Sequence, residues 1–145
     1  MRHIVKKNEL KQVLVFTSST FKADNVAAKL RKNNIQATAI HSKKSQGART
    51  SALVKFKEGT LRVLVTTDLL ARGIDIEFLP YVINFELPRS PKDFIHRIGR
   101  TGRAENPGKA ITFFCSEEEH HFKVIQKKMK KDIETLDGDK IVLSL

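Results

Sequence analysis

Val13-Leu-Val-Phe-Thr17 is a continuous apolar run with the length of one β-strand, and it is the segment that decides the fold. The next segment, residues 21–33, repeats its apolar residues at helical spacing. Those residues share one face of the predicted helix: Ala23, Val26, Ala27 and Leu30. A buried strand followed by an amphipathic helix is the unit from which parallel sheets are built. This part of the chain therefore predicts an α/β fold.

The same alternation of strand-like and helix-like patterns continues after residue 33. Further strands are expected at residues 37–40, 61–66, 81–85 and 108–114. Helices are expected at residues 45–57, from residue 90 toward residue 100, and from residue 116 to about residue 131. Gly59 ends the helix at residues 45–57. The helix from residue 90 has Ser90 as its N-cap and Pro91 at its first position, and Ser116 is the N-cap of the last helix. We therefore expect one domain, residues 1–145, with five or more mostly parallel strands flanked by helices.

The charge of the chain points to a polyanionic partner. Its 27 lysines and arginines outnumber 16 aspartates and glutamates, which gives a formal net charge of +11. Aromatic residues make up only 7% of the chain and none is tryptophan, so no platform for stacking bases is obvious. If a nucleic acid binds, its phosphate backbone should supply most of the affinity.

The composition also disfavours several classes of protein. No apolar run reaches about 18 residues and no apolar leader is present, so a membrane protein is not expected. Cys115 is the only cysteine, which excludes a disulfide framework and favours the cytoplasm. Because it follows two phenylalanines, Cys115 is expected to be buried as a small hydrophobic residue. The histidines and the cysteine do not have the spacing of a zinc site, so no metal site is predicted.

The segment His96-Arg-Ile-Gly-Arg-Thr-Gly-Arg103, which we call the arginine segment, predicts a phosphate site. Arg97 and Arg100 are one helical turn apart and should face the same way. Gly102 permits a tight exit that brings Arg103 toward the same point. The planar guanidinium group matches phosphate oxygens and stays charged at any working pH. The alternative is a basic helix end that is simply solvated.

Two further segments lie where parallel strands end and helices begin. Residues 66–75 leave a strand with Thr67, whose hydroxyl and backbone N–H can contact a phosphate. In the same segment Gly73 permits close backbone approach, and Asp75 can accept hydrogen bonds from a ribose hydroxyl. Gln46 and Arg49 open the helix at residues 45–57, and a helix start beside an arginine favours phosphate binding. The alternatives are a polar capping loop for the first segment and a solvated arginine for the second.

Together these segments resemble the second RecA-like domain of DEAD-box RNA helicases, and the resemblance covers essentially the whole chain. Residues 13–19 are similar to motif IV, Gln46 and Arg49 to the QxxR element, residues 66–75 to motif V, and the arginine segment to motif VI. A leading histidine in motif VI favours DEAD-box helicases over DEAH-type helicases and DNA translocases, which usually have glutamine there. The resemblance implies a RecA-like three-layer domain. Residues 44–50 are most similar to the bacterial RhlE subgroup.

The resemblance also implies roles in ATP hydrolysis for six residues. Arg100 and Arg103 would be arginine fingers that reach the γ-phosphate of ATP held by a partner domain. Asp75 would contact the ribose, and Gly73 would support the cleft between the domains. The remaining two residues would couple ATP binding to motifs of the partner domain: His96 and Arg97.

A second set of residues would hold the RNA backbone in this family. It consists of Ser18 in the loop after Phe16, Gln46, Arg49 and Thr67. The chain departs from the family pattern at Leu70 and Thr66, which replace alanines, and at Ser42, which replaces a glycine. Leu70 is expected to tighten the packing under motif V.

The sequence contains neither a G-x-x-x-x-G-K-[ST] phosphate loop nor an Asp-Glu-x-Asp segment. ATP and Mg²⁺ would therefore be bound mainly by a first RecA-like domain that this chain lacks, and the domain alone should be an inactive, monomeric half of an enzyme. The expected function is ATP-dependent unwinding of RNA duplexes in the cytoplasm, with single-stranded and duplex RNA and the first domain as partners. The alternative is a non-catalytic RNA-binding or regulatory module that retains the fold.

Overall fold

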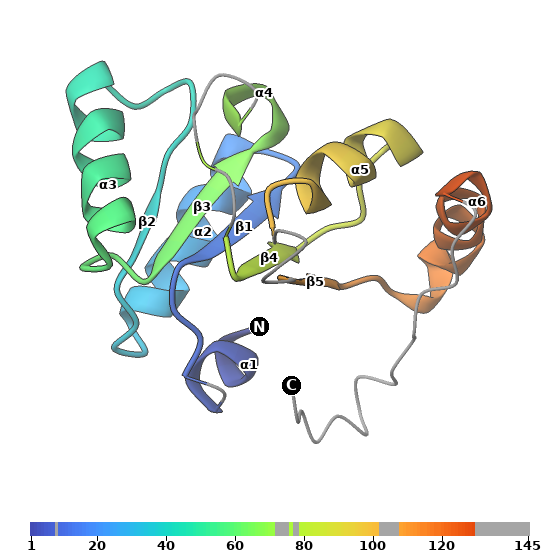
Figure 1. The fold of residues 1–145 in the computed structure, drawn as a ribbon, viewed down its shortest axis with the longest axis horizontal. Helices are drawn as coiled ribbons and strands as arrows, with labels where there is room; N and C mark the ends of the chain where they lie inside the picture. Colours follow the sequence, from blue (N-terminus) through green and yellow to red (C-terminus); the bar gives the residue numbers. More distant parts are fainter. Residues whose placement is uncertain (8, 72–75, 77–78, 102–107, 130–145) are drawn as a thin grey trace.

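The structure is a computed structural model that describes residues 1–7, 9–71, 76, 79–101 and 108–129. Within this part of the chain a sheet of five parallel strands has the order β2-β3-β1-β4-β5 (Figure 1). The strands are β1 (Val13–Thr17), β2 (Ala37–Ala39), β3 (Val63–Thr67), β4 (Tyr81–Asn84) and β5 (Lys109–Thr112). Every strand overlaps its predicted segment, with ends that differ by no more than two residues, so the predicted parallel sheet is confirmed.

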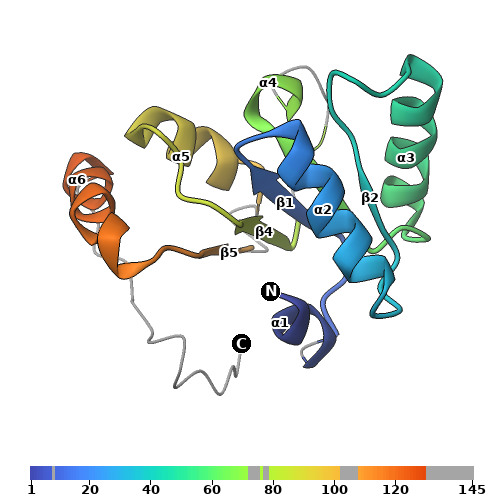
Figure 2. The same cartoon turned by 180° about the vertical axis from the view of Figure 1, so that it is seen from behind.

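Helices cover both faces of this sheet, as a three-layer domain requires. They are α1 (Arg2–Lys7), α2 (Thr20–Arg31), α3 (Gln46–Glu58), α4 (Asp68–Ala71), α5 (Pro91–Ile98) and α6 (Glu119–Met129), and the 3-10 turn η1 (Ser116–Glu118) precedes α6. Helix α2 lies behind the sheet in Figure 1 and in front of it in Figure 2. Helix α3 covers the opposite face, where its Ala52 and Phe56 belong to the core cluster of Leu14 and Phe16. Helix α6 packs against α5 at the end of the molecule far from α3.

Alternating side chains of the strands build a separate core on each face of the sheet. Val13 and Val15 are buried against α1 and α2, whereas Leu14 and Phe16 are buried with residues of α3. A third, smaller cluster joins α5 to α6. Its buried members are Leu87, Phe94, Phe122 and Ile125. Helix α5, which begins the arginine segment, is thus held by α6 as well as by the sheet.

Local sequence signals explain where the main helices begin and end. Gly59 ends α3 with φ of 84°, a left-handed conformation that favours glycine. The Ser90 hydroxyl accepts a hydrogen bond from the Asp93 backbone N–H at 3.1 Å, and Pro91 occupies the first turn of α5. Both predicted helix boundaries are therefore confirmed.

The structure corrects two predictions at the start of the last helix. Cys115 is exposed, not buried. It follows the edge strand β5 and begins the connection to η1, so neither core encloses it. Cys115 also takes the N-cap position predicted for Ser116, and its backbone N–H donates to the Glu118 carboxylate at 2.9 Å. The segment therefore opens as a 3-10 turn one residue earlier, and the α-helix begins only at Glu119.

No helix within the described residues has both the length and the apolar character needed to cross a membrane.

Candidate phosphate and nucleic-acid interface

The carboxyl ends of three adjacent strands bring the predicted site segments together. Thr17 at the end of β1 is aligned with Thr67 at the end of β3, and Phe16 is aligned with Asn84 at the end of β4. Helix α4 and the beginnings of α2, α3 and α5 lie at this same edge (Figure 1). The loop with Ser18 and the strand end with Thr67 are therefore neighbours, as the expectation for parallel sheets requires.

Arg97 is buried inside the domain, where it joins three segments. Its Nε and Nη2 atoms donate to the two carboxylate oxygens of Asp68, each at 2.6 Å. Its Nη1 donates to the Glu86 backbone carbonyl at 2.9 Å, and the guanidinium carbon lies 5.3 Å from the ring centre of Phe16. Only 3% of the surface of Arg97 is exposed, and its bidentate ion pair with Asp68 offsets the cost of burying its charge.

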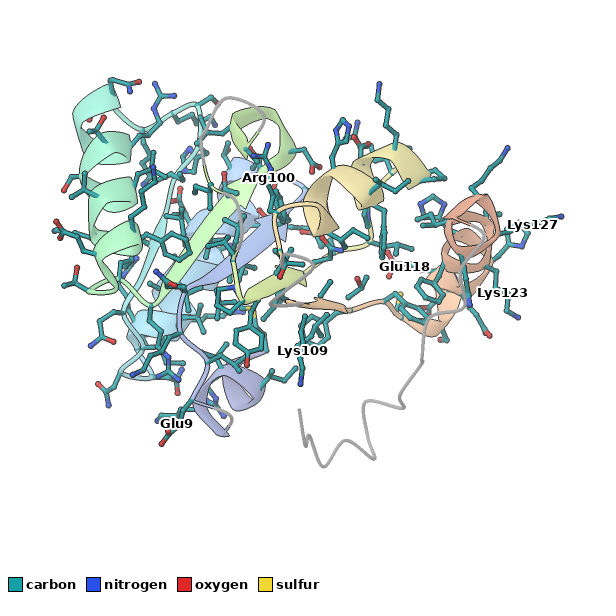
Figure 3. All side chains as sticks on the ribbon, viewed as in Figure 1. Glu9, Arg100, Lys109, Glu118, Lys123 and Lys127 are labelled. Carbon is teal, nitrogen blue, oxygen red and sulfur yellow. The ribbon has the colours of Figure 1, made fainter. Side chains whose placement is uncertain are left out.

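Arg100 points toward α4 as well, but it is only partly buried. Its Nη2 donates to the Ala71 carbonyl at the end of α4 at 2.9 Å, and its Nη1 donates to the Ile76 carbonyl at 3.4 Å. Figure 3 shows Arg100 close to α4. Arg97 and Arg100 therefore face the same way, as their spacing predicts. They differ in exposure because Arg97 lies on the buried face of α5 and Arg100 lies beyond the end of the helix.

A shallow hollow between α4 and α5 collects most of the described arginine-segment side chains. It is lined by Phe16, Asp68, Ala71, Asp93, His96, Arg97 and Arg100. His96 is exposed, so this hollow presents a histidine and an arginine to solvent above the buried Arg97. Three predicted site residues lie outside the described residues: Gly73, Asp75 and Arg103.

Ser18 is exposed, and both of its donor groups point to one carboxylate. Its backbone N–H donates to Glu86 Oε1 at 3.3 Å and its hydroxyl donates to Oε2 at 2.5 Å. Lys22, in the first turn of α2, forms an ion pair with Oε2 at 2.9 Å. Burial alone would raise the pKa of Glu86, but the hydrogen bonds from Ser18 and Lys22 outweigh it and hold the pKa below its usual value.

Gln46 and Arg49 lie in the first turn of α3, at the same edge of the sheet. Gln46 is exposed, and its Nε2 donates to the Thr50 hydroxyl at 3.5 Å. Arg49 is partly buried. Its Nε is fully shielded from solvent and makes no hydrogen bond to the described protein atoms. A buried guanidinium N–H without a partner is costly, so Arg49 is suited to an anionic ligand.

A buried histidine shapes the loop that leads to this turn. His41, 2% exposed, lies 3.0 Å from Asp24 through Nε2, and its Nδ1 accepts a hydrogen bond from the Lys43 backbone N–H at 3.2 Å. Asp24 also pairs with Lys44 at 3.0 Å. Burial would raise the pKa of Asp24, yet the bonds from Lys44 and His41 lower it. This cluster fixes the loop before α3 and hence the position of Gln46.

Sequence reasoning missed the two carboxylates that organise the site. Asp68 follows Thr67 directly and Glu86 follows β4 by two residues, so both stand at the carboxyl ends of strands where site residues gather. That placement was the available signal. Among the described residues no group of histidine, cysteine and carboxylate side chains could hold a metal ion.

Comparisons with known proteins agree on one family. The model of the helicase conserved C-terminal domain matches residues 1–105. The chain is 37% identical over 139 residues to the ATP-dependent RNA helicase DBP8 of Lodderomyces elongisporus, covering 94% of this chain and 31% of that protein. It is 39% identical over 123 residues to the DEAD-box ATP-dependent RNA helicase CshA of Bacillus subtilis, covering 85% of this chain and 25% of that protein.

Solved structures give the same result. A DEAD box protein from the hyperthermophile Methanococcus jannaschii superimposes with a TM-score of 0.85 at 38% identity, over 93% of this chain and 37% of that chain. The present chain thus spans about a third or less of the length of the two curated relatives described above.

Proposed function

Because the chain belongs to the helicase conserved C-terminal domain family of DEAD-box RNA helicases, we propose that it works as the second RecA-like domain of an ATP-dependent RNA helicase. It would supply arginine fingers for ATP hydrolysis and half of a groove for single-stranded RNA. The observation that carries this proposal is the Arg97 bridge. One buried guanidinium joins Asp68 to the helix that leads to Arg100, and Asp68 directly follows Thr67, which we assign to the RNA backbone.

The arginine segment supports the part of the proposal that concerns ATP. Arg100 is partly exposed beside the hollow that also contains His96, and its guanidinium group is suited to a phosphate. We assign Arg100 and Arg103 to the γ-phosphate, Asp75 to the ribose, Gly73 to the interdomain cleft, and His96 with Arg97 to coupling between the domains. ATP supplies the free energy of the cycle, and ATP and Mg²⁺ would be held mainly by the first RecA-like domain.

The strand ends support the part that concerns RNA. Arg49 has a buried Nε that would gain a partner on a phosphate oxygen. Ser18, Gln46 and Thr67 lie at the same edge of the sheet and offer neutral donors, which suits backbone recognition without reading of base sequence. The net charge of +11 favours a polyanion as well.

The finer features of the proposal concern the subgroup, the location and the oligomeric state of the domain. The RhlE-like subgroup rests on residues 44–50, and the relatives described above, from a yeast and a bacterium, do not favour it over other subgroups. A cytoplasmic location and a monomeric state of the domain stay predictions. A non-catalytic RNA-binding or regulatory module is the second candidate, because the chain carries no phosphate loop of its own.

Reconstitution of ATPase activity tests the proposal. The purified chain should not release phosphate from ATP, with or without RNA, because arginine fingers alone do not hold the nucleotide. Addition of a DEAD-box first domain, joined through a linker, should produce RNA-stimulated turnover. Turnover by the chain alone would contradict the two-domain assignment, and an inactive but correctly folded pair would favour the non-catalytic module.

A further inference from the structure

The carboxylate of Glu86 occupies donors that the RNA backbone would need. Three donors converge on it: the Ser18 backbone N–H, the Ser18 hydroxyl and the Lys22 ammonium group. These are the groups that a nonbridging phosphate oxygen prefers, and a carboxylate is the closest protein equivalent of such an oxygen. The loop after β1 is therefore already bound to an anion that belongs to the protein itself.

This contact is open to a ligand. Glu86 is 21% exposed, the Lys22 side chain is 51% exposed, and Ser18 is exposed. A phosphate approaching Ser18 and Lys22 would therefore meet the negative charge of Glu86 beside them. Ser18 cannot give the same N–H to both groups in good geometry, so phosphate and carboxylate exclude each other.

We propose that Glu86 is an intramolecular competitor of the RNA backbone, whose carboxylate leaves Ser18 and Lys22 when an RNA phosphate binds there. This inference rests on the proposed RNA-binding function. It adds a residue that lowers the affinity of the domain for polyanions, so that only a ligand with further contacts, such as those of Arg49 and Thr67, displaces the carboxylate.

The fold allows this exchange without a change of backbone. The Glu86 carbonyl is held by Arg97 at 2.9 Å, and the neighbouring Phe85 N–H donates to the Phe16 carbonyl at 3.0 Å. Displacement therefore requires only a new rotamer of the Glu86 side chain. Because Arg97 belongs to the arginine segment, the residue that yields to RNA is anchored directly to the helix that precedes the arginine finger.

Affinity for a fluorescent single-stranded RNA decides between competition and support. Glu86→Gln keeps the shape of the side chain but exchanges charge-assisted hydrogen bonds for neutral ones, so we expect binding about three- to tenfold tighter. Glu86→Ala removes the acceptor and should tighten binding at least as much. The matched control is Glu58→Gln, which removes one exposed carboxylate at the far end of α3 and makes the same change of net charge.

A higher salt concentration distinguishes the loss of the Glu86 contact from the general effect of the change in net charge. In about 0.3 M salt the Debye length falls below about 6 Å, so Glu58→Gln should return to the wild-type affinity while Glu86→Gln stays tighter. Unchanged or weaker binding by both Glu86 variants would overturn the inference and make Glu86 a support of the loop.

Arg49→Ala distinguishes failure of this inference from failure of the proposed function. If wild type binds RNA and Arg49→Ala weakens it, RNA binding stands whatever the Glu86 variants do. The NMR chemical shift of the Ser18 amide gives an independent readout. RNA binding and Glu86→Ala should each move it away from the value that it has while the amide is bonded to the Glu86 carboxylate. An Ser18 resonance that saturating RNA leaves unchanged would also overturn the inference.

Discussion

At the scale of single residues, Arg97 and Arg100 show how one short segment performs two physical tasks. Arg97 is 3% exposed and paired through two bonds with Asp68, whereas Arg100 remains partly exposed and bonds carbonyl groups at the end of α4. The first is suited to holding the domain together, and the second to reaching a ligand.

The burial of Arg97 predicts a large effect on stability. Arg97→Ala removes one partner of a buried ion pair, and since Asp68 is one-third exposed, we expect a loss of about 2–4 kcal/mol in the free energy of unfolding. Urea denaturation of the purified chain measures it. The control is Arg31→Ala, an exposed arginine that bonds the Ala37 carbonyl, for which about 0–1 kcal/mol is expected. If both variants lose the same free energy of unfolding, the buried ion pair of Arg97 does not stabilise the domain as proposed.

Arg100 and Arg49 should differ in their response to RNA. In a reconstituted two-domain enzyme, Arg100→Lys should lower ATP turnover by about 10³-fold or more, because lysine keeps the charge but loses the planar fork. Arg49→Ala should instead raise the RNA concentration needed for half-maximal turnover. ATPase measured against RNA concentration separates the two. If excess RNA restores the ATP turnover of Arg100→Lys, the assignment of Arg100 to the γ-phosphate is wrong. Arg31→Lys is the control, for which no change in turnover is expected.

The lowered pKa of Glu86 predicts a pH-dependent contribution to stability. The ordinary value is 4.5 and the folded-state pKa lies below it, so the ionised carboxylate stabilises the fold above that pH. This contribution is lost as the pH falls through the lowered value. Glu86→Gln should therefore flatten the acid side of the stability profile, measured by urea denaturation from about pH 3 to 6. If the unfolding free energy of Glu86→Gln falls with pH as steeply as that of the wild type, Glu86 does not contribute to the pH dependence of stability.

At the scale of elements, α5 depends on its N-cap and on α6. Ser90 caps α5 and bonds both the N–H and the carboxylate of Asp93, while Phe94 and Phe122 lie in the cluster that joins α5 to α6. Any loosening of this helix moves the arginine segment, since Arg97 and Arg100 follow within ten residues of the cap.

Two serines at predicted helix starts should therefore respond differently to substitution. Ser90→Ala removes a cap bond and should cost about 1 kcal/mol. Ser116→Ala should cost only a few tenths of that, because Cys115 and not Ser116 occupies the N-cap of η1. Urea denaturation of both variants, under identical conditions, makes the comparison. A larger loss for Ser116→Ala would contradict the position of the cap.

At the scale of the whole molecule, charge and topology combine to predict weak binding to RNA that does not depend on base sequence. The described candidate contacts are few and come from one edge of a single sheet. Each phosphate neutralised on a single strand should contribute about −0.7 to the slope of log affinity against log salt, so three or four contacts should give a slope of about −2 to −3. Fluorescence anisotropy with two unrelated RNA sequences, across a salt series, measures it. Affinity that ignores salt or differs strongly between the sequences would contradict backbone recognition.

The sequence alone determined the features that depend on neighbours along the chain. The apolar run of residues 13–17, the helical spacing after it, the left-handed Gly59 and the Ser90 cap are local, so they predict strands, helices and their ends. Parallel topology then places Ser18 and Thr67 at one edge, because parallel strands share their carboxyl end. The family resemblance rests on the same local segments.

Only the tertiary structure decided which side chains meet across the sheet. Asp68 and Arg97 are 29 residues apart, and Ser18 and Glu86 are 68 residues apart. No pattern in the sequence distinguishes the buried Arg97 from the partly exposed Arg100, since both carry the same charge in the same segment. Cys115 was misplaced for a similar reason, because an edge strand leaves its connections outside the core. Burial and long-range pairing arise when separate segments pack together, and they depend on the fold as a whole.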